Sequence, residues 1–282
     1  MTVIHEKAAV FHALHQRDQI LVLLNAWDAG SARIFEAAGA PAIATTSSGV
    51  ANALGYPDGE AVPWKLQVHQ IQLITAAVGA PVTADIESGF AANAGELKAR
   101  IAEVIAAGAV GINLEDAHHG PSVSPLFTRD EQYARIAAAR EAAGQSGVNL
   151  FINARTDVFL ARVGAEDPAW QMAETLERAR LFASAGANSI FVPGVTDSGT
   201  IRQLASEITL PLNILAMAGT PGVSELQELG VKRVSIGSGA ARATLTLARK
   251  IAVELLGSGT YGFLDGAIPF AEVNALFAHR KS

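Results

Sequence analysis

The chain has 282 residues, of which 50% are hydrophobic and 17% are charged, enough to bury one large domain or two small ones. Its net charge of −6, with no basic cluster, argues against a nucleic-acid partner, and the absence of cysteine excludes disulfides, thiolate metal sites and thiol catalysis. No apolar run reaches the roughly 18 residues of a membrane span, and the N-terminal segment has no apolar signal core, so we expect a soluble cytoplasmic protein with no membrane partner.

Short apolar runs alternate with helix-like segments along the whole chain. The sequence predicts strands at residues 20–24, 42–46, 82–85, 110–114, 149–153, 189–192, 212–215 and 233–236. It predicts helices at residues 5–15, 31–38, 64–78, 94–107, 129–143, 170–185, 200–207, 223–229, 240–256 and 270–279. Because most of the strands are continuous apolar runs, we expect them to be parallel and buried on both faces.

This alternation gives eight strand–helix units in about 240 residues, the size of a (β/α)8 TIM barrel. A doubly wound open sheet is the alternative, but residues 25–33, after the first strand, lack the G-x-G-x-x-G turn that such a sheet normally shows. No linker-like stretch divides the chain. We therefore predict a barrel domain over residues 1–257 and a C-terminal helical extension over residues 258–282, packed on the barrel or on a neighbouring subunit.

Acidic residues follow two of the predicted strands. Asp85 and Glu87 end the third strand, and Glu115 and Asp116 end the fourth. Residues two apart in a strand share a face, and carboxylates held together need a cation, a proton or bulk water. Since the chemistry of such barrels lies at the carboxyl ends of the strands, the acids predict one hard-metal site built from oxygen ligands. Solvated loop acids are the alternative.

Other polar residues also follow the strands. Arg155 is the outstanding cation and can hold a substrate carboxylate bidentately, although a salt bridge to Asp157 or to a site acid is the alternative. The turn at residues 47–49 can donate hydrogen bonds to the same carboxylate. His118 and His119 are the only paired histidines, and either can act as an acid or base unless both are solvated loop residues. The remaining candidates are Trp27, Asp58 and Asn213.

Five segments together resemble the isocitrate lyase/phosphoenolpyruvate mutase superfamily. They are NAWDAGSAR at residues 25–33, Ser48-Gly49 with Asp58, ADIESGF at residues 84–90, GINLED at residues 111–116 and INARTD at residues 152–157. They occur in order, at family-like spacings, over about half of the chain. The resemblance implies a barrel whose eighth helix is exchanged with a neighbouring subunit, in a homodimer or homotetramer.

The resemblance also implies roles for individual residues. Mg²⁺ or Mn²⁺ would lie at Asp85, with the other acids contributing directly or through water, and Arg155 with the Ser48-Gly49 turn would hold the carboxylate of a 2-oxo acid. The implied reaction cleaves or forms a C–C or P–C bond next to a carbonyl, through a metal-stabilised enolate. The predicted metal ligands are Asp85, Glu87 and Glu115; the predicted catalytic residues are Asp58, Arg155 and His118; the predicted substrate-binding residues are Trp27, Ser47, Ser48, Gly49, Arg155 and Asn213.

The chain departs from the family pattern at the loop that supplies the proton. The lyases carry K-K-C-G-H there, with cysteine as the donor, and the phosphonate mutases carry Lys and Asn, whereas this loop reads HHGPS at residues 118–122. The usual second aspartate of the metal motif is Glu87 here. Oxaloacetate decarboxylation, which needs only the metal, the clamp and a proton from water or His118, is therefore the preferred prediction. The alternatives are an isocitrate or methylisocitrate lyase that uses His118 or His119, a phosphonopyruvate or phosphoenolpyruvate mutase-like enzyme, and a non-catalytic metabolite-binding barrel.

Overall fold

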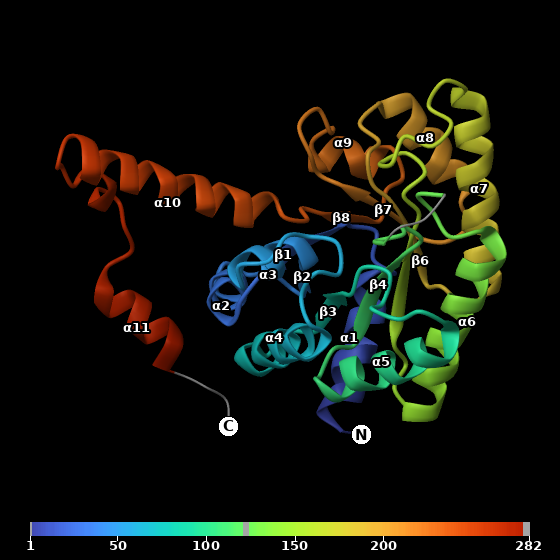
Figure 1. The fold of residues 1–282 in the computed structure, drawn as a ribbon, viewed down its shortest axis with the longest axis horizontal. Helices are drawn as coiled ribbons and strands as arrows, with labels where there is room; N and C mark the ends of the chain where they lie inside the picture. The colour runs from blue at the N-terminus through green and yellow to red at the C-terminus, as the bar shows by residue number, and fades with distance from the viewer. Residues whose placement is uncertain (1, 121–123, 279–282) are drawn as a thin grey trace.

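A computed structural model describes residues 2–120 and 124–278, so part of the 118–122 loop and the last predicted helical residue lie outside it. Eight parallel strands close into a barrel in the order β1-β2-β3-β4-β5-β6-β7-β8 (Figure 1). They are β1 (Leu21–Ala26), β2 (Ile43–Thr45), β3 (Val82–Asp85), β4 (Gly111–Glu115), β5 (Phe151–Arg155), β6 (Ser189–Val192), β7 (Leu212–Leu215) and β8 (Arg233–Ser235). The predicted (β/α)8 barrel is confirmed.

Helices surround this barrel and extend beyond it (Figure 1). They are α1 (Val3–Leu14), α2 (Ala29–Ala37), α3 (Ser47–Ala53), α4 (Trp64–Ala77), α5 (Ala94–Ala106), α6 (Arg129–Ser146), α7 (Pro168–Ser184), α8 (Ser198–Glu207), α9 (Val223–Glu228), α10 (Gly239–Gly257) and α11 (Phe270–Ala278), with a 3-10 turn at Gly262–Leu264. Within the described residues, none of these helices is long and apolar enough to cross a membrane.

One helix was not expected. The sequence predicted a turn at residues 47–49 and a loop over residues 51–60, but α3 begins at Ser47, because the Thr46 side chain accepts a hydrogen bond from the Gly49 N–H and caps the helix. Gly49 is required by close packing: a Cβ at this position would lie 2.5 Å from Thr46 Cγ2 and 2.9 Å from Trp27 Cβ. The helix start turns Ser47 toward the neighbouring strand end.

The strands bury two different surfaces. In every strand except β2, even-numbered residues such as Ile112, Ile152 and Ile214 lie in the apolar core between strands and helices. In β2 the order is reversed, because Ile43 pairs in register with Leu24 and Val82. The opposite residues point into the barrel, where polar side chains bond across strands: Asn153 Nδ2 donates to Asn113 Oδ1 at 2.8 Å. The barrel interior is therefore unusually polar below the acidic strand ends.

Helix α1 closes the amino-terminal end of the barrel. Its Phe11 ring lies edge-on to Phe151 at 5.3 Å, and the His15 ring, just after the helix, stacks on Phe151 at 3.9 Å. Gly111 makes room for this contact, since a Cβ there would lie 2.9 Å from Phe11 Cε1. This packing covers the start of β5 and leaves the carboxyl ends of the strands as the expected place for a site.

Helix α10 projects away from the barrel, and the chain then turns back through α11 (Figure 1). Helix α11 contacts α2, where the Arg33 guanidinium donates to the Leu276 carbonyl. Large apolar side chains on this arm are open to solvent, including Leu256 at 88% and Phe270 at 82% exposure. The exchange of this helix between subunits, and the domain boundary at residue 257, stay predictions.

Candidate active site

A cavity of about 150 Å³ lies at the carboxyl ends of the strands. It contains five of the residues that the sequence singled out, which come from the ends of three strands and from the loops that follow. Its lining consists of Asn25, Thr46, Ser47, Ser48, Asp58, Asp85, Asn113, Arg155, Phe191, Leu215, Ser235, Gly237 and Ser238. The predicted position of the site is thus where the fold provides a pocket.

Asp85 is held at the end of β3 by the neighbouring β2–α3 segment. Its Oδ2 accepts hydrogen bonds from the Ser47 backbone N–H at 3.0 Å and from Ser47 Oγ at 2.9 Å, while its own N–H donates to Thr45 Oγ1 at 2.8 Å. Its Oδ1 is buried and has no hydrogen-bond partner among the described residues. A buried carboxylate oxygen without a partner is costly, so this atom is available to a ligand.

His119 bridges the two glutamates of the site. Its Nε2 lies 2.6 Å from Glu115 Oε1 and 3.7 Å from Glu87 Oε2, and both carboxylates are almost fully buried. The ring stands between the ends of β3 and β4. A positive imidazolium at this position would offset part of the negative charge that the two acids bring together.

Glu87 lies in a network of residues with unusual backbone conformations. Glu60, Glu87 and Phe90 have φ of 56°, 52° and 51°, values that non-glycine residues seldom adopt. The Glu60 N–H donates to Glu87 Oε2 at 2.7 Å, and the Glu60 carboxylate accepts from Ser88 Oγ and the Phe90 N–H, each at 2.7 Å. Such strain persists only where surrounding contacts enforce it, which is typical of functional loops.

Burial and mutual repulsion raise the pKa values of the acids in the site. Burial raises the pKa of Glu87 to about 8 and also raises the pKa of Glu115. Burial first, and then the Asp85 charge, raises the pKa of Asp58. Burial opposes ionisation of His119, but its hydrogen bond to Glu115 and the charges of Glu115, Glu87 and Glu60 together outweigh burial and raise its pKa to about 9. A bound cation would favour the ionised form of these acids.

Arg155 is held on two sides. Its Nε and Nη2 donate to the two carboxylate oxygens of Asp157 at 2.6 and 2.8 Å, and its Nη1 lies 2.6 Å from Glu115 Oε2. Burial alone would lower the pKa of Arg155, but the Glu115 and Asp157 charges outweigh it and raise the pKa. The salt bridges considered as an alternative role are thus present. A guanidinium has five N–H donors, and these three contacts leave two of them for a substrate.

Asp116 anchors this arrangement from behind. Its Oδ1 accepts the Asp157 backbone N–H at 2.8 Å, and its Oδ2 lies 3.0 Å from Arg178 Nη1 of α7. Asp116 is fully buried, and burial raises its pKa to about 7. The acid next to Glu115 in the sequence therefore fixes the Asp157–Arg155 pair.

The two histidines of the loop are separated by the fold. The His118 ring packs on Phe127 with a centroid distance of 3.9 Å and does not join the acids, whereas His119 does. The sequence predicted His118 as the catalytic residue and left His119 only as an alternative. Adjacent side chains diverge from the backbone, and no spacing rule in an irregular loop says which one points inward.

Three predicted substrate-binding residues lie outside the cavity lining. Trp27 packs beside Phe35 with ring centroids 6.2 Å apart, and the Gly49 backbone lies against Trp27. Asn213 is buried in the barrel interior, where its Oδ1 accepts from Ser235 Oγ at 3.1 Å. Their predicted roles in substrate binding stay predictions.

Several lining residues were missed, among them Asn113, Phe191 and Leu215. A usable signal existed, since each lies at an odd-numbered position, on the same strand face as the predicted Asp85 or Arg155. Counting back by two residues from Glu115 would have found Asn113. The apolar pair carried no chemical signal by itself.

The donor set fits a hard divalent cation, because it consists of carboxylate oxygens and includes the unpartnered Asp85 Oδ1. In the part of the chain that the structure describes, no three acidic or histidine side chains already converge as a ligand set. Glu115 instead faces Arg155 and His119. Binding a metal at Asp85 would therefore require the neighbouring side chains to rearrange.

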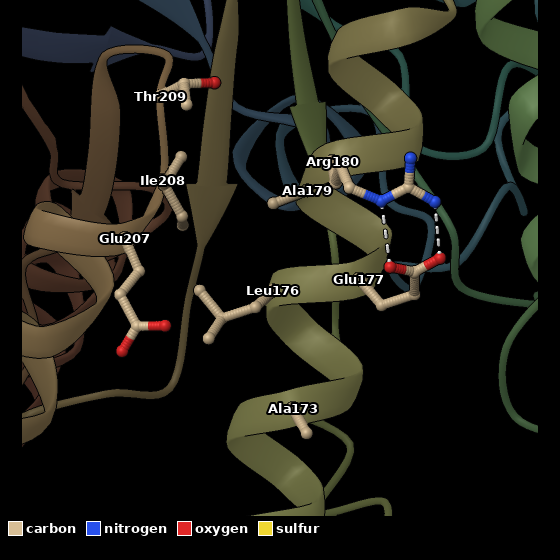
Figure 2. Close-up of a pocket in the computed structure, with 8 residues that line it drawn as sticks. All are labelled: Ala173, Leu176, Glu177, Ala179, Arg180, Glu207, Ile208 and Thr209. Atoms are coloured by element: carbon tan, nitrogen blue, oxygen red, sulfur yellow. Dashed lines mark hydrogen bonds and ion pairs between the residues drawn. The ribbon is translucent and has the colours of Figure 1, made fainter.

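A second hollow lies on the outer wall, between α7 and the end of α8 (Figure 2). Ala173, Leu176, Ala179 and Ile208 give it an apolar lining, and Arg180 turns to the Glu177 carboxylate with two hydrogen bonds, so this groove gathers none of the acids described above.

Comparison with known proteins agrees with this geometry. The profile of the phosphoenolpyruvate phosphomutase family matches residues 11–256. Two solved structures from Burkholderia cenocepacia J2315 are similar: a candidate phosphonomutase (45% identity, TM-score 0.82, 88% of this chain and 99% of that one) and a candidate lyase/mutase (36%, 0.91, 99% and 98%).

Relatives with assigned activities are more distant. The 2-methylisocitrate lyase of Escherichia coli (strain K12) is 28% identical, over 77% of this chain and 73% of its own length. The oxaloacetate decarboxylase of Bradyrhizobium sp. (strain ORS 278) is also 28% identical, over 74% and 70%. The family match covers nearly the whole barrel and both kinds of relative carry out cleavage reactions, so this chain belongs to the isocitrate lyase/phosphoenolpyruvate mutase superfamily of lyases and mutases.

Proposed function

We propose that this protein is a Mg²⁺- or Mn²⁺-dependent enzyme that cleaves a C–C bond in a small 2-oxo acid, with oxaloacetate decarboxylation as the preferred reaction. One observation carries the proposal: a carboxylate oxygen of Asp85 is buried with no hydrogen-bond partner in the part of the chain that the structure describes, and it lies in the same small pocket as Arg155, which keeps two N–H donors. The similarity to an oxaloacetate decarboxylase supports the choice of reaction.

Asp85 would hold the metal directly, and Asp58, Glu87 and Glu115 would contribute directly or through water. The bound metal supplies Lewis-acid polarisation of the substrate carbonyl. Arg155 and the Ser48 hydroxyl both line the pocket and would orient the substrate carboxylate, and Asp157 and Glu115 hold the Arg155 donors in place before the substrate arrives.

His119 is proposed as the proton donor in place of His118. Loss of CO2 from oxaloacetate leaves the electrons of the broken bond on the enolate of pyruvate, and one proton must then reach its methylene carbon. His119 lies beside Glu115 and Glu87, and these contacts raise its pKa, so the ring carries a proton that it can release at this site. The His118 ring packs on Phe127 instead.

The size of the pocket favours a small substrate. An engineered cavity of about 150 Å³ in another protein holds one benzene molecule, which is close in size to pyruvate or oxalate. Isocitrate and methylisocitrate are considerably larger, and the chain lacks the cysteine that the lyases use.

We also propose that the enzyme works in the cytoplasm as a homodimer or homotetramer, since the apolar arm after β8 is exposed in one chain.

A substrate panel tests the proposal. Pyruvate release is measured with oxaloacetate, 2-methylisocitrate or phosphonopyruvate, with Mg²⁺ and again with EDTA. We expect the fastest release from oxaloacetate and its loss in EDTA. Faster release from either other substrate would replace the preferred reaction, and release from none would contradict the enzymatic proposal.

A further inference from the structure

We propose that Asn113 is a further substrate-binding residue, whose side-chain NH2 group faces the pocket as a fixed donor, and that Arg233 is the positioning residue that holds it so from across the barrel. The inference rests on the proposed function, because it names a contact to the small oxyanion that the pocket would bind.

Arg233 reaches across the barrel. It lies on β8, its side chain is fully buried, and its Nη2 donates to Asn113 Oδ1 of β4 at 3.1 Å. In the closed strand order, β4 and β8 stand on opposite sides of the barrel. Its Nε also donates to Ser235 Oγ at 3.3 Å. The guanidinium therefore spans the interior beneath the acidic strand ends.

This contact decides which way the Asn113 amide points. Arginine has only donors, so the Asn113 atom that faces Arg233 must be the oxygen. Asn153 agrees with this: its Oδ1 accepts from Ser189 Oγ at 2.6 Å, which leaves its Nδ2 to donate to the same Asn113 oxygen at 2.8 Å. Arg233 thus fixes the amide, the Asn153 contact is consistent with that orientation, and the Asn113 Nδ2 must face away from both.

Away from these donors lies the pocket. Asn113 is one of its lining residues, is paired in register with Asp85 and precedes Glu115 by two positions on the same strand face. Within residues 2–120 and 124–278, the hydrogen bonds of Asn113 involve its oxygen and not its Nδ2. A fixed neutral donor beside Asp85 suits a carboxylate or enolate oxygen of the substrate, because it needs no reorganisation when charge develops there.

Arg233 is buried without a carboxylate at ion-pair distance among the described residues, and only the Asp85 charge attracts it from farther away. Its Nη1 has no hydrogen-bond partner in the same part of the chain. A buried, unpaired charge destabilises a fold, so an apolar residue would be the stable choice if this position served packing alone. Holding the Asn113 amide in one orientation gives the Arg233 charge a role.

The Asn113→Asp variant separates binding from stability. The new carboxylate keeps an oxygen toward Arg233 and can pair with its charge, which offsets its repulsion with Asp85, so the variant should fold and its melting temperature is measured alongside affinity. The atom facing the pocket changes from a donor to a negative acceptor, so oxalate affinity at saturating Mg²⁺, measured by calorimetry, should fall about 10- to 100-fold.

Asn188→Asp is the matched control. Asn188 Oδ1 likewise accepts from an arginine, Arg140, and from the Ile152 N–H, but this residue precedes β6 at the closed end of the barrel. The same chemical change there should leave oxalate affinity unchanged. A similar loss of affinity in both variants would mean a general effect of added charge and would overturn the inference.

Arg233 is tested as a positioning residue with Arg233→Met, or with Arg233→Lys if the first does not fold. If Arg233 acts through Asn113, the loss of oxalate affinity in Asn113→Ala should not grow when the Arg233 change is added. Additive losses would reduce Arg233 to a structural role. If the wild type binds oxalate and Asn113→Asp binds it equally well, the inference is overturned and the proposed function stands. If the wild type neither binds oxalate nor releases pyruvate, both the proposed function and the inference are contradicted.

Discussion

Arg155 combines two tasks in one side chain, because it neutralises Glu115 and Asp157 and still has donors for a ligand. If it clamps the substrate, Arg155→Lys should lower kcat/KM for the preferred 2-oxo acid about 30- to 1,000-fold, since lysine keeps the charge but loses the planar fork. Metal affinity should change little. Steady-state kinetics and calorimetry check both expectations.

Arg180→Lys is the control for this change. Arg180 is also paired bidentately, with Glu177, but at the outer groove (Figure 2). Turnover should be that of the wild type. If Arg155→Lys turns over every 2-oxo acid at a near-wild-type rate, Arg155 serves only to neutralise Glu115 and Asp157. That result would remove the main support for a carboxylate substrate.

The two adjacent histidines provide a second comparison at this scale. His119→Gln should lower kcat by about 100- to 10,000-fold, the usual contribution of a positioned acid or base. His118→Gln should stay near wild type, because its ring packs on Phe127 rather than on the acids. Equal kcat values for both variants would assign reprotonation to water.

At the scale of elements, α1 makes the stability of the barrel depend on pH through His15. Burial against Phe151, and then the Arg233 charge, lowers the pKa of His15 to about 3, whereas the unfolded chain titrates near 6.5. Between these values only the unfolded state binds the proton. The stability that neutral His15 contributes is therefore complete above pH 6.5 and is lost as the pH falls toward 3, by about 1.4 kcal/mol per pH unit.

Chemical denaturation between pH 4.5 and 7 measures this effect. The free energy of unfolding should fall less steeply on acidification in His15→Leu than in wild type, by the slope of one proton, whatever the variant's absolute stability. Identical slopes would show that His15 is not held neutral by the packing of α1.

The sequence predicted elements better than it predicted the orientation of side chains. All eight strands were expected within a few residues, since buried parallel strands are continuous apolar runs bounded by glycine-capped helices. Helix α3 was missed because its start, at residues 47–49, looks like a polar turn and Thr46 supplies the cap. Arg233 was passed over because one arginine in a short strand reads as an end residue, and only the closed barrel shows it reaching Asn113.

At the scale of the whole molecule, the arm after β8, which runs from α10 to α11, exposes apolar side chains that no other described part of the single chain covers. Leu256, Tyr261, Leu264 and Phe270 are each more than half exposed, and exposed apolar groups that are this numerous mark an interaction surface. We predict a homo-oligomer in which this arm packs on another subunit. Truncation after Gly257 should give monomeric or insoluble protein, as measured by light scattering. A wild-type mass equal to a single chain would contradict the prediction.

The central claim is that the acids at the ends of β3 and β4 form a metal-dependent active site. Calorimetric titration of Mg²⁺ or Mn²⁺ into Asp85→Ala, with the exposed Asp130→Ala as control, tests it most directly. We predict that Asp85→Ala loses metal binding and oxaloacetate turnover while the metal-free protein melts at an equal or higher temperature, because one of several repelling buried acids is gone. Equal metal affinity in wild type, Asp85→Ala and Asp130→Ala would contradict the account.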